Sequence, residues 1–273
     1  MYVKIVLLSL WNSLKCFYER DDDMCSCDIQ AIIFDLEDTL VDREKSRMKF
    51  LEEQFERFHE LMVTVQRRDF EKVYLTLNPY GIEDVEWVYQ ELVKRLNIER
   101  ISWKTFYNDY KMHHYRYHFP FYDTLVALDK LRSMGYKLGV VANGKSEEIT
   151  HVMNAIGIYP YIHYVSTSDE VGAMKPDPII FEDILKHLGI TAHHALYVGD
   201  CPLNDIAAAH AMGMKTAWMA NSVIGTPEEH ELDYTIESLS DLIEVCKQIE
   251  RGGSMMNLFL TKENVAIHYK TKR

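Results

Sequence analysis

A short apolar, mostly β-branched run near the start of the chain ends abruptly in carboxylates. Residues 32–34 (IIF) are followed by residues 35–40 (DLEDTL). The apolar run is typical of a buried strand in a parallel sheet, and such sheets carry their chemistry just beyond the carboxyl ends of their strands. Side chains two apart share a face of a strand, so we expect Asp35 and Glu37 to point the same way. This pair suits a nucleophile with a proton donor, or a metal site, whereas the simpler alternative is an acidic loop.

Strand and helix patterns alternate through most of the remaining chain, which indicates a doubly wound parallel sheet. We expect further strands at 137–143, 161–165, 195–199 and 215–219. We expect helices at 123–134, 146–156, 178–188, 202–212 and 239–250, with Asp123 capping the first of them.

An interruption follows the first strand, because residues 44–118 show helical periodicity and no strand of comparable strength. About four helices are expected there, as a bundle inserted into the α/β core. The predicted division is therefore a core at 28–43 and 119–251, and a helical cap at 44–118. Residues 1–27 are interpreted as a non-core extension, with an amphipathic membrane anchor as the alternative. Residues 252–273 form a tail, either paired as a hairpin or disordered.

The chain of 273 residues carries a net charge of −12, which argues against a nucleic-acid partner because there is no basic surplus. We predict no membrane partner either, and the sequence leaves the oligomeric state open. The five cysteines favour a reducing, cytoplasmic location, because they are scattered and form no C-x-x-C pair. They are Cys16, Cys25, Cys27, Cys201 and Cys246.

Polar residues also follow three later strands. Asn143 and Gly144 follow the apolar run at 137–142 (KLGVVA), and Lys175 follows a loop after the next strand. Asp200 and Asp205 come after the strand at 195–199. Each has an ordinary structural explanation, as a turn, a solvated lysine, a helix cap or a helix surface. Together, on the strand ends of one sheet, they predict a site with several carboxylates, one lysine and one amide.

This ordered set resembles the haloacid dehalogenase-like superfamily, in the branch with a helical cap inserted after the first motif. Residues 34–40 (FDLEDTL) are similar to the family's DxDxT loop, residues 175–181 (KPDPIIF) to its lysine motif, and residues 199–205 (GDCPLND) to its acidic last motif. The resemblance covers roughly residues 29–250. It implies a Rossmann-like core, dependence on Mg²⁺ and an aspartyl-phosphate intermediate.

The resemblance also implies a role for each motif residue. Asp35 would be the nucleophile, and Lys175 would neutralise the phosphoryl group. Mg²⁺ would bind Asp35, the backbone carbonyl of Glu37, and Asp200, with Asp205 as a direct or water-mediated ligand. The remaining phosphate-binding residues would be Thr39, which braces the nucleophile loop, together with Asn143 and Gly144.

Two residues depart from the family pattern. Glu37 stands where the family's phosphatases usually carry a second Asp, which protonates the leaving oxygen and then activates water. The added methylene matters, because a misplacement near 1 Å can lower a rate about 100-fold. Ala142 replaces the usual Ser or Thr before Asn143, which removes one phosphate-binding hydroxyl. Both changes are expected to weaken phosphatase turnover without excluding it.

Three functions therefore remain open. The favoured one is a Mg²⁺-dependent phosphatase of a small phosphorylated metabolite that works through an aspartyl-phosphate intermediate, with Asp35, Glu37 and Lys175 as the catalytic residues. The second is a regulatory protein that binds Mg²⁺ and phosphate but has lost most of its catalysis. The third is dehalogenation, which the retained Asp200 and Asp205 disfavour.

The cap is expected to close over the site and set substrate choice. Basic side chains on and beside it are the candidate contacts. His114 and His118 are spaced four apart and so would share one helix face, where packing is a simpler role than metal binding. The candidates are Arg43, Arg47, Lys104, His113, His114, Arg116 and His118.

Overall fold

The structure is a computed structural model, and it describes residues 29–79, 81, 83–220 and 225–251. The interpretations of residues 1–27 and of the tail at 252–273 fall outside the described residues. Contacts group Ile29–Ile243 into one compact unit and assign the chain from Glu244 onward, with Met1–Asp28, to another. Within the described part of the chain, no helix is both long and apolar enough to cross a bilayer.

Six parallel strands form one sheet in the order β3-β2-β1-β4-β5-β6. The first strand lies at the centre with all four residues buried, which explains its uninterrupted apolar sequence. This order, with reversal beside β1, confirms the predicted Rossmann-like, doubly wound core. The strands are β1 (Ala31–Phe34), β2 (Lys137–Ala142), β3 (Tyr164–Thr167), β4 (Ala195–Gly199), β5 (Lys215–Met219) and β6 (Tyr234–Ile236).

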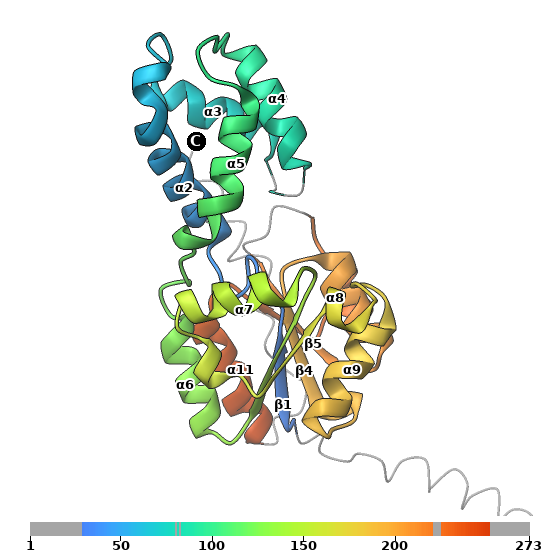
Figure 1. Cartoon of the computed structure of the whole chain (residues 1–273). Coiled ribbons are helices and arrows are strands. Elements are labelled where there is room, and N and C mark those ends of the chain that lie inside the picture. The colour runs from blue at the N-terminus through green and yellow to red at the C-terminus, as the bar shows by residue number, and fades with distance from the viewer. Residues whose placement is uncertain (1–28, 80, 82, 221–224, 252–273) are drawn as a thin grey trace, which may run out of the picture. The chain divides into compact units, whose positions relative to one another are not determined.

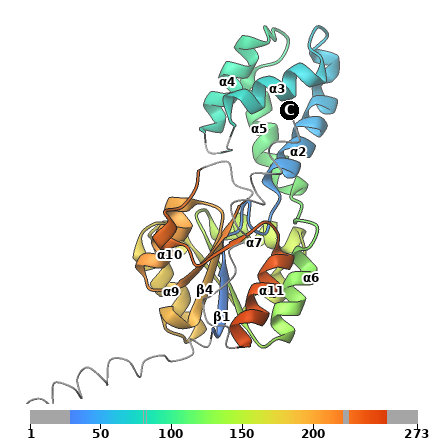
Figure 2. The ribbon, with the colours of Figure 1, turned by 180° about the vertical axis from the view of Figure 1, so that it is seen from behind.

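Helices cover both faces of the sheet. Helix α6 (Thr124–Ser133) lies on one face, and α9 (Pro178–Leu188) on the other (Figure 1). Seen from behind, α9 and α10 (Ala208–Ala211) lie together, opposite α6 (Figure 2). The α9 face packs Ile180, Phe181 and Ile184 against apolar strand residues, all of them fully buried. The remaining core helices are α7 (Ser146–Ala155), α8 (Ser168–Val171) and α11 (Leu239–Glu250).

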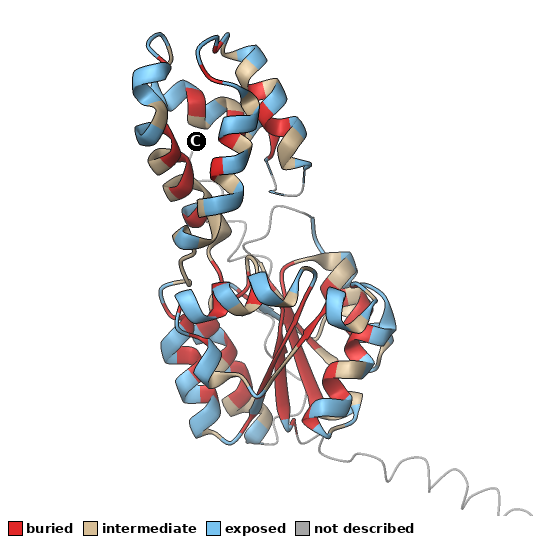
Figure 3. Cartoon of the chain, in the orientation of Figure 1, coloured by how far each residue is buried: buried red, intermediate tan, exposed pale blue. Residues whose placement is uncertain are grey.

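Four helices fill the interval between β1 and α6, as the sequence predicts. They are α2 (Arg43–Phe58), α3 (Arg67–Leu77), α4 (Val85–Arg95) and α5 (Trp103–His113). Their buried residues, from Phe50 to Phe106, form a hydrophobic cluster that shares no residue with the cluster under α9. In Figure 3 the positions coloured as buried lie along the strands of the sheet and in stripes on the helices. The interval is therefore a helical insert with its own core.

Three of the insert helices, α2, α4 and α5, begin at a side-chain cap, whereas α3 has none. Asp42 accepts from the backbone N–H of Lys45, and Ser102 accepts from that of Lys104, which satisfies N–H groups that have no partner within the first turn. The residue limits given above for the core (28–43 and 119–251) and for the cap (44–118) stay a prediction.

Several expected boundaries differ from the structure. The strand expected at 161–165 begins instead at Tyr164, because residues 159–161 form a 3₁₀ turn around Pro160. Helix α5 ends at His113, so His114 and His118 do not share an α-helical face. Asp123 stands at the start of α6 but does not cap it, since its carboxylate accepts from the backbone and hydroxyl of Ser240. The sequence analysis also missed α8 and β6, which are only four and three residues long.

Candidate active site

The carboxyl ends of the central strands bring distant parts of the chain together. Phe34 of β1 is in register with Val140 of β2 and Val198 of β4. The loops that begin with Asp35 and Asp200 therefore start at the same edge of the sheet. The N–H of Asp35 donates to the carbonyl of Val198 at 2.9 Å, which fixes the backbone at this point.

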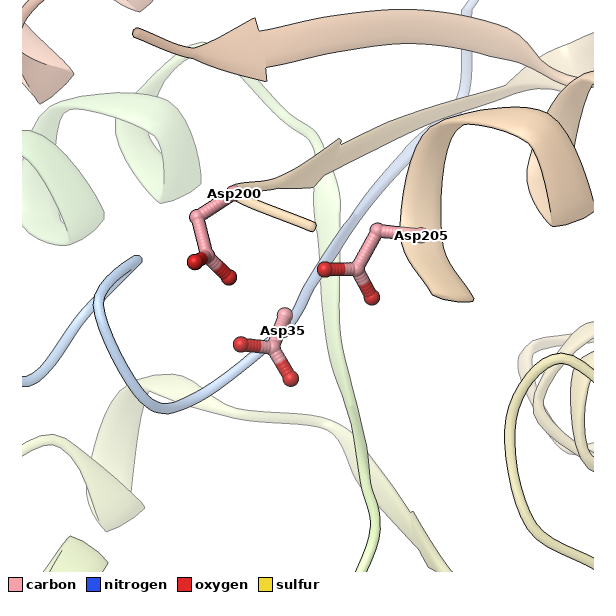
Figure 4. A group of neighbouring side chains, drawn as sticks. All are labelled: Asp35, Asp200 and Asp205. Carbon is pink, nitrogen blue, oxygen red and sulfur yellow. The ribbon is translucent and has the colours of Figure 1, made fainter. Parts of the chain in front are cut away.

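Three carboxylates converge at this edge. Asp35, Asp200 and Asp205 are all buried, and each offers an oxygen that lies within 4.8 Å of the others' (Figure 4). Like charges at this separation repel strongly, because little water remains to screen them. Some positive charge must therefore compensate this cluster.

Lys175 supplies the first compensating charge. Its Nζ donates to Asp35 Oδ1 at 2.5 Å and to Asp205 Oδ1 at 2.7 Å, and the side chain is only 5% exposed. Tyr197 completes the contact, since its hydroxyl donates to Asp205 Oδ1 at 3.0 Å and lies 3.3 Å from Lys175 Nζ. The lysine thus joins the loop that begins at Asp35 to the segment at residues 199–205.

Asp205 reaches this position through an irregular helix. Residues 202–207 form a π-helical turn, in which the carbonyl of Cys201 accepts from the N–H groups of both Asp205 and Ile206. The N–H of Cys201 in turn donates to Asp205 Oδ2. The predicted regular helix at 202–212 was therefore wrong in its first half. Such π-turns occur often at functional sites, and here the turn directs Asp205 inward.

Gly199 makes room for that carboxylate. A Cβ at this position would lie 2.5 Å from Asp205 Cβ, closer than packed atoms approach. The strand end therefore requires glycine for steric reasons, because the side chain of Asp205 occupies the space beside it.

Burial and mutual repulsion govern protonation in the cluster. Burial, partly opposed by Lys175, raises the pKa of Asp35 to about 6. Burial, together with the charges of Asp35 and Asp205, raises the pKa of Asp200 to about 7. Burial opposes charge on Lys175, but Asp205 and Asp35 outweigh it, so the pKa of Lys175 rises well above its usual value. The lysine therefore stays cationic at neutral pH.

The donor set fits a hard divalent cation. Three carboxylates face one lysine, which leaves two negative charges uncompensated when all three are ionised. Carboxylate oxygens are the ligands that Mg²⁺ prefers. Among the described residues, this is the one cluster of His, Cys, Asp and Glu with metal-site geometry. Asp205 has the least capacity left for a metal, because Lys175, Tyr197 and Cys201 already occupy three of its acceptor positions.

Main-chain hydrogen bonds fix the conformation of the loop at residues 35–41. The N–H groups of Leu40 and Val41 both donate to the carbonyl of Leu36, and the N–H of Asp38 donates to Val41. Thr39 is fully buried, yet its hydroxyl has no hydrogen-bond partner among the described residues. The Thr39 hydroxyl was expected to brace this loop, but main-chain hydrogen bonds brace it instead.

Glu37 lies beside the cluster without direct contact to Lys175. Its carboxylate is 3.5 Å from Arg43 and 3.9 Å from His118, and Arg43 also lies 3.3 Å from Asp38. Arg43 was predicted to contact substrate, but the structure pairs it with these two acids. These ion pairs hold the loop that follows β1, and a contact of Arg43 with substrate stays a prediction.

Asn143 and Gly144 have protein partners in the structure. The Asn143 amide donates to the carbonyl of Lys175 at 3.1 Å and accepts from the N–H of Lys175 at 2.8 Å. The N–H of Gly144 donates to Ser168 Oγ at 2.9 Å. The Asn143 side chain thus fixes the backbone that carries the lysine. A direct hold on phosphate by either residue remains a prediction.

A cavity of about 470 Å³ opens from this cluster toward the helical insert. It is lined by both carboxylate-bearing loops and by four of the seven predicted cap contacts. Those four are Arg43, Arg47, His114 and His118, whereas Lys104, His113 and Arg116 lie elsewhere.

Sequence reasoning missed Tyr197 and the pairing of Arg43. Tyr197 could have been found, because a tyrosine in an otherwise apolar buried strand needs a partner for its hydroxyl. The pairing of Arg43 could not, because it depends on how α2 enters the insert.

Comparison with known proteins identifies the family of the chain. The sequence model described as haloacid dehalogenase-like hydrolase matches residues 32–219. A glyceraldehyde 3-phosphate phosphatase of Methanocaldococcus jannaschii is 35% identical over 133 residues, which is 48% of this chain and 58% of that protein. The chain thus spans little more than half of that relative.

Two further proteins match over most of their length. The phosphatase of the same name from Pyrococcus abyssi is 31% identical over 242 residues, which is 83% of this chain and 97% of that protein. The crystal structure of the HAD-hydrolase YfnB from Bacillus subtilis, bound to magnesium, aligns with a TM-score of 0.66 and 21% identity. That alignment covers 80% of this chain and 98% of YfnB, and it supports the fold.

The steric role of Gly199 is testable. We expect Gly199→Ala to lower the free energy of unfolding by about 1–3 kcal/mol, because its Cβ would overlap that of Asp205. Gly139→Ala on β2, which β1 separates from β4, is the matched control, since the atoms nearest to its Cβ belong to the flexible side chains of Ile184 and Leu188, at 3.0–3.2 Å. Urea unfolding measures both. An equal or larger loss for Gly139→Ala would contradict the argument.

Proposed function

The chain belongs to the haloacid dehalogenase-like hydrolase family, and we propose that it is a Mg²⁺-dependent phosphatase of a small phosphorylated metabolite. The observation that carries the proposal is the bridge made by Lys175, which holds Asp35 and Asp205 at one edge of the sheet, open to a cavity. A buried carboxylate held by a cation and facing a cavity suits covalent catalysis on a phosphate ester. The two relatives named as phosphatases support the same chemistry.

Asp35 is proposed as the nucleophile. Its Oδ1 accepts from Lys175, and its Oδ2 is the oxygen proposed to attack phosphorus. The new Oδ2–P bond forms as the ester P–O bond breaks, and the leaving alkoxide takes a proton. In the second step a water oxygen attacks phosphorus, the Oδ2–P bond breaks, and free phosphate leaves with the Asp35 carboxylate restored. Lys175 stays cationic through both steps and offsets the negative charge of the phosphoryl group.

Mg²⁺ would be held by Asp35, Asp200 and the backbone carbonyl of Glu37, with Asp205 acting through water because its acceptors are already used. Bound there, the ion supplies positive charge to the phosphate oxygens and to the carboxylates that surround them. Asp200 would remain ionised as a ligand.

Glu37 is proposed to exchange the proton. Burial raises the pKa of Glu37 against the opposing effect of Arg43, which favours a carboxyl that can donate to the leaving oxygen. The resulting carboxylate can then accept a proton from water. Arg43 lies where the chain enters the insert, and His118 lies where the chain leaves it. Their contacts hold the carboxylate of Glu37 in position.

Two other functions are the alternatives. The pairing of Glu37 with Arg43 is also compatible with a regulatory protein that binds Mg²⁺ and phosphate with little turnover, because the paired acid is less free to reach the leaving group. Dehalogenation is less well supported, since it gives no role to Asp200 beside Asp205. We keep a cytoplasmic location and the division into a core (28–43 and 119–251) and a cap (44–118) as part of the proposal.

The proposal predicts that Asp35→Asn abolishes phosphate release. We expect a fall of at least about 1,000-fold for a generic aryl phosphate, because the amide cannot form the phosphoryl ester. EDTA should stop the wild-type enzyme, and Mg²⁺ should restore it. Asp129→Asn, on the exposed face of α6, is the control and should keep full activity. Undiminished release by Asp35→Asn would remove Asp35 as the nucleophile.

The fit of Glu37 gives a second prediction. Shortening the side chain in Glu37→Asp should change kcat by about 10-fold or more while the KM changes little, because only the position of the proton donor moves. A rise in kcat would mean that the native glutamate slows turnover. A fall in kcat would mean that the site requires the longer side chain of glutamate. Glu37→Gln should lower kcat in either case. A Glu37→Gln enzyme with wild-type kcat would exclude Glu37 from proton transfer.

A further inference from the structure

The two arginines on the first turns of α2 differ in their surroundings. Arg43 and Arg47 are four residues apart, so they lie on one face of the helix, about one turn from each other. Arg43 faces Glu37 and Asp38, and these acids raise its pKa despite its burial. Arg47 lies farther from the carboxylate cluster along the same face, and it lines the same cavity.

Arg47 is held in place by neutral groups alone. Its Nη1 donates to the carbonyl of Pro79 at 3.1 Å, and its Nη2 donates to the carbonyl of Asn78. No carboxylate of the described residues lies within 4.0 Å of its guanidinium. The buried Nε has no partner there either. Arg47 is thus an oriented cation that no carboxylate of the described residues contacts directly.

The turn between α3 and α4 is shaped to accept this side chain. Gly81 has a φ of +73°, and a Cβ there would lie 3.2 Å from Arg43 Cδ and 3.4 Å from Arg47 Nη1. The backbone therefore approaches both arginines closely, and the two carbonyls fix the guanidinium plane. An arginine bound in this way is pre-organised, which reduces the entropy lost when it binds a ligand.

Burial without a counterion has an energetic consequence. Burial lowers the pKa of Arg47, and the repulsion of Arg43 adds to this effect. The nearby Tyr74, Asp38 and Glu44 oppose it only in part. A negative group entering the cavity would therefore gain a charge-assisted hydrogen bond that the free protein lacks.

We propose that Arg47 forms an anion subsite, in which the guanidinium binds a second negative group of the substrate. The proposal rests on the proposed function for the other end of the cavity, where Asp35 and Lys175 receive the phosphoryl group. The lining of the cavity includes three aromatic side chains, those of Phe50, Tyr110 and Tyr115. The substrate is therefore a phosphate monoester whose alcohol part joins the ester, through an apolar spacer, to a carboxylate or a second phosphate.

Matched substrate pairs test the subsite. The probes are phosphorylated ω-hydroxy acids with chains of two to six carbons, each compared with the alkyl phosphate of the same length. Bisphosphates of the α,ω-diols form a third arm, which distinguishes a phosphate from a carboxylate. At the chain length that spans the two ends of the cavity, we expect the wild-type kcat/KM to be about 10-fold or more higher for the anionic substrate than for the alkyl phosphate. The reason is that one charge-assisted hydrogen bond contributes a free energy equivalent to such a ratio.

Substitution of Arg47 should remove that preference. In Arg47→Gln the KM of the anionic substrate should rise about 10-fold, whereas kcat and the values for the alkyl phosphate should stay unchanged. Arg47→Lys keeps the charge and should retain part of the preference. Arg68→Gln is the control, since Arg68 is exposed on α3 and does not line the cavity. Circular dichroism verifies that each variant is folded.

The outcomes separate this inference from the proposed function. Hydrolysis of alkyl phosphates without a preference at any length, or a preference that survives in Arg47→Gln, would overturn the subsite and leave the phosphatase intact. If the wild type released no phosphate from any probe, the proposed function would fail. Calorimetric titration of the same pairs, with Mg²⁺ present, would then test the subsite. The same ratio is expected between the affinity for the anionic compound and the affinity for the alkyl phosphate.

Discussion

The site depends on a single buried ammonium group set among carboxylates. Lys175 touches Asp35 and Asp205, and its backbone is fixed by the side-chain amide of Asn143. Removing one partner from such a buried pair typically costs about 3–5 kcal/mol, because the other charge is left uncompensated. The lysine therefore links folding to the proposed function, since the same contacts hold together three segments of the chain and fix the carboxylate of Asp35, the proposed nucleophile.

The excess negative charge around this lysine explains several neighbouring features. Burial is the main cause of the raised pKa values of Asp35 and Asp200, and the repulsion between the carboxylates adds to it. A hard cation relieves that crowding, so the ion and the phosphate would bind to a site whose shape exists before they arrive. The π-helical turn and Gly199 serve the same end, because both are needed to bring Asp205 inward.

Much of this arrangement was predictable from the sequence, because parallel strands leave their carboxyl ends at one edge. The apolar run before Asp35 and the strand before Asp200 placed both acids correctly. What depended on local geometry could not be predicted. Nothing in the sequence distinguishes a π-turn at residues 202–207 from an ordinary helix, and Pro160 moved the start of β3 by three residues. The partner of Arg43 depended on how α2 leaves the core, and the partners of Arg47 on a turn 31 residues away.

The central claim is that Asp35 receives a phosphoryl group beside Lys175 and a divalent ion. A crystal structure of the protein grown with Mg²⁺ and beryllium fluoride, which mimics an acyl phosphate, tests it most directly. The account predicts beryllium bonded to the oxygen of Asp35 that Lys175 leaves free, with Mg²⁺ held between Asp35 and Asp200. Beryllium on any other carboxylate, or a Lys175 ammonium turned away from Asp35 in that complex, would contradict it.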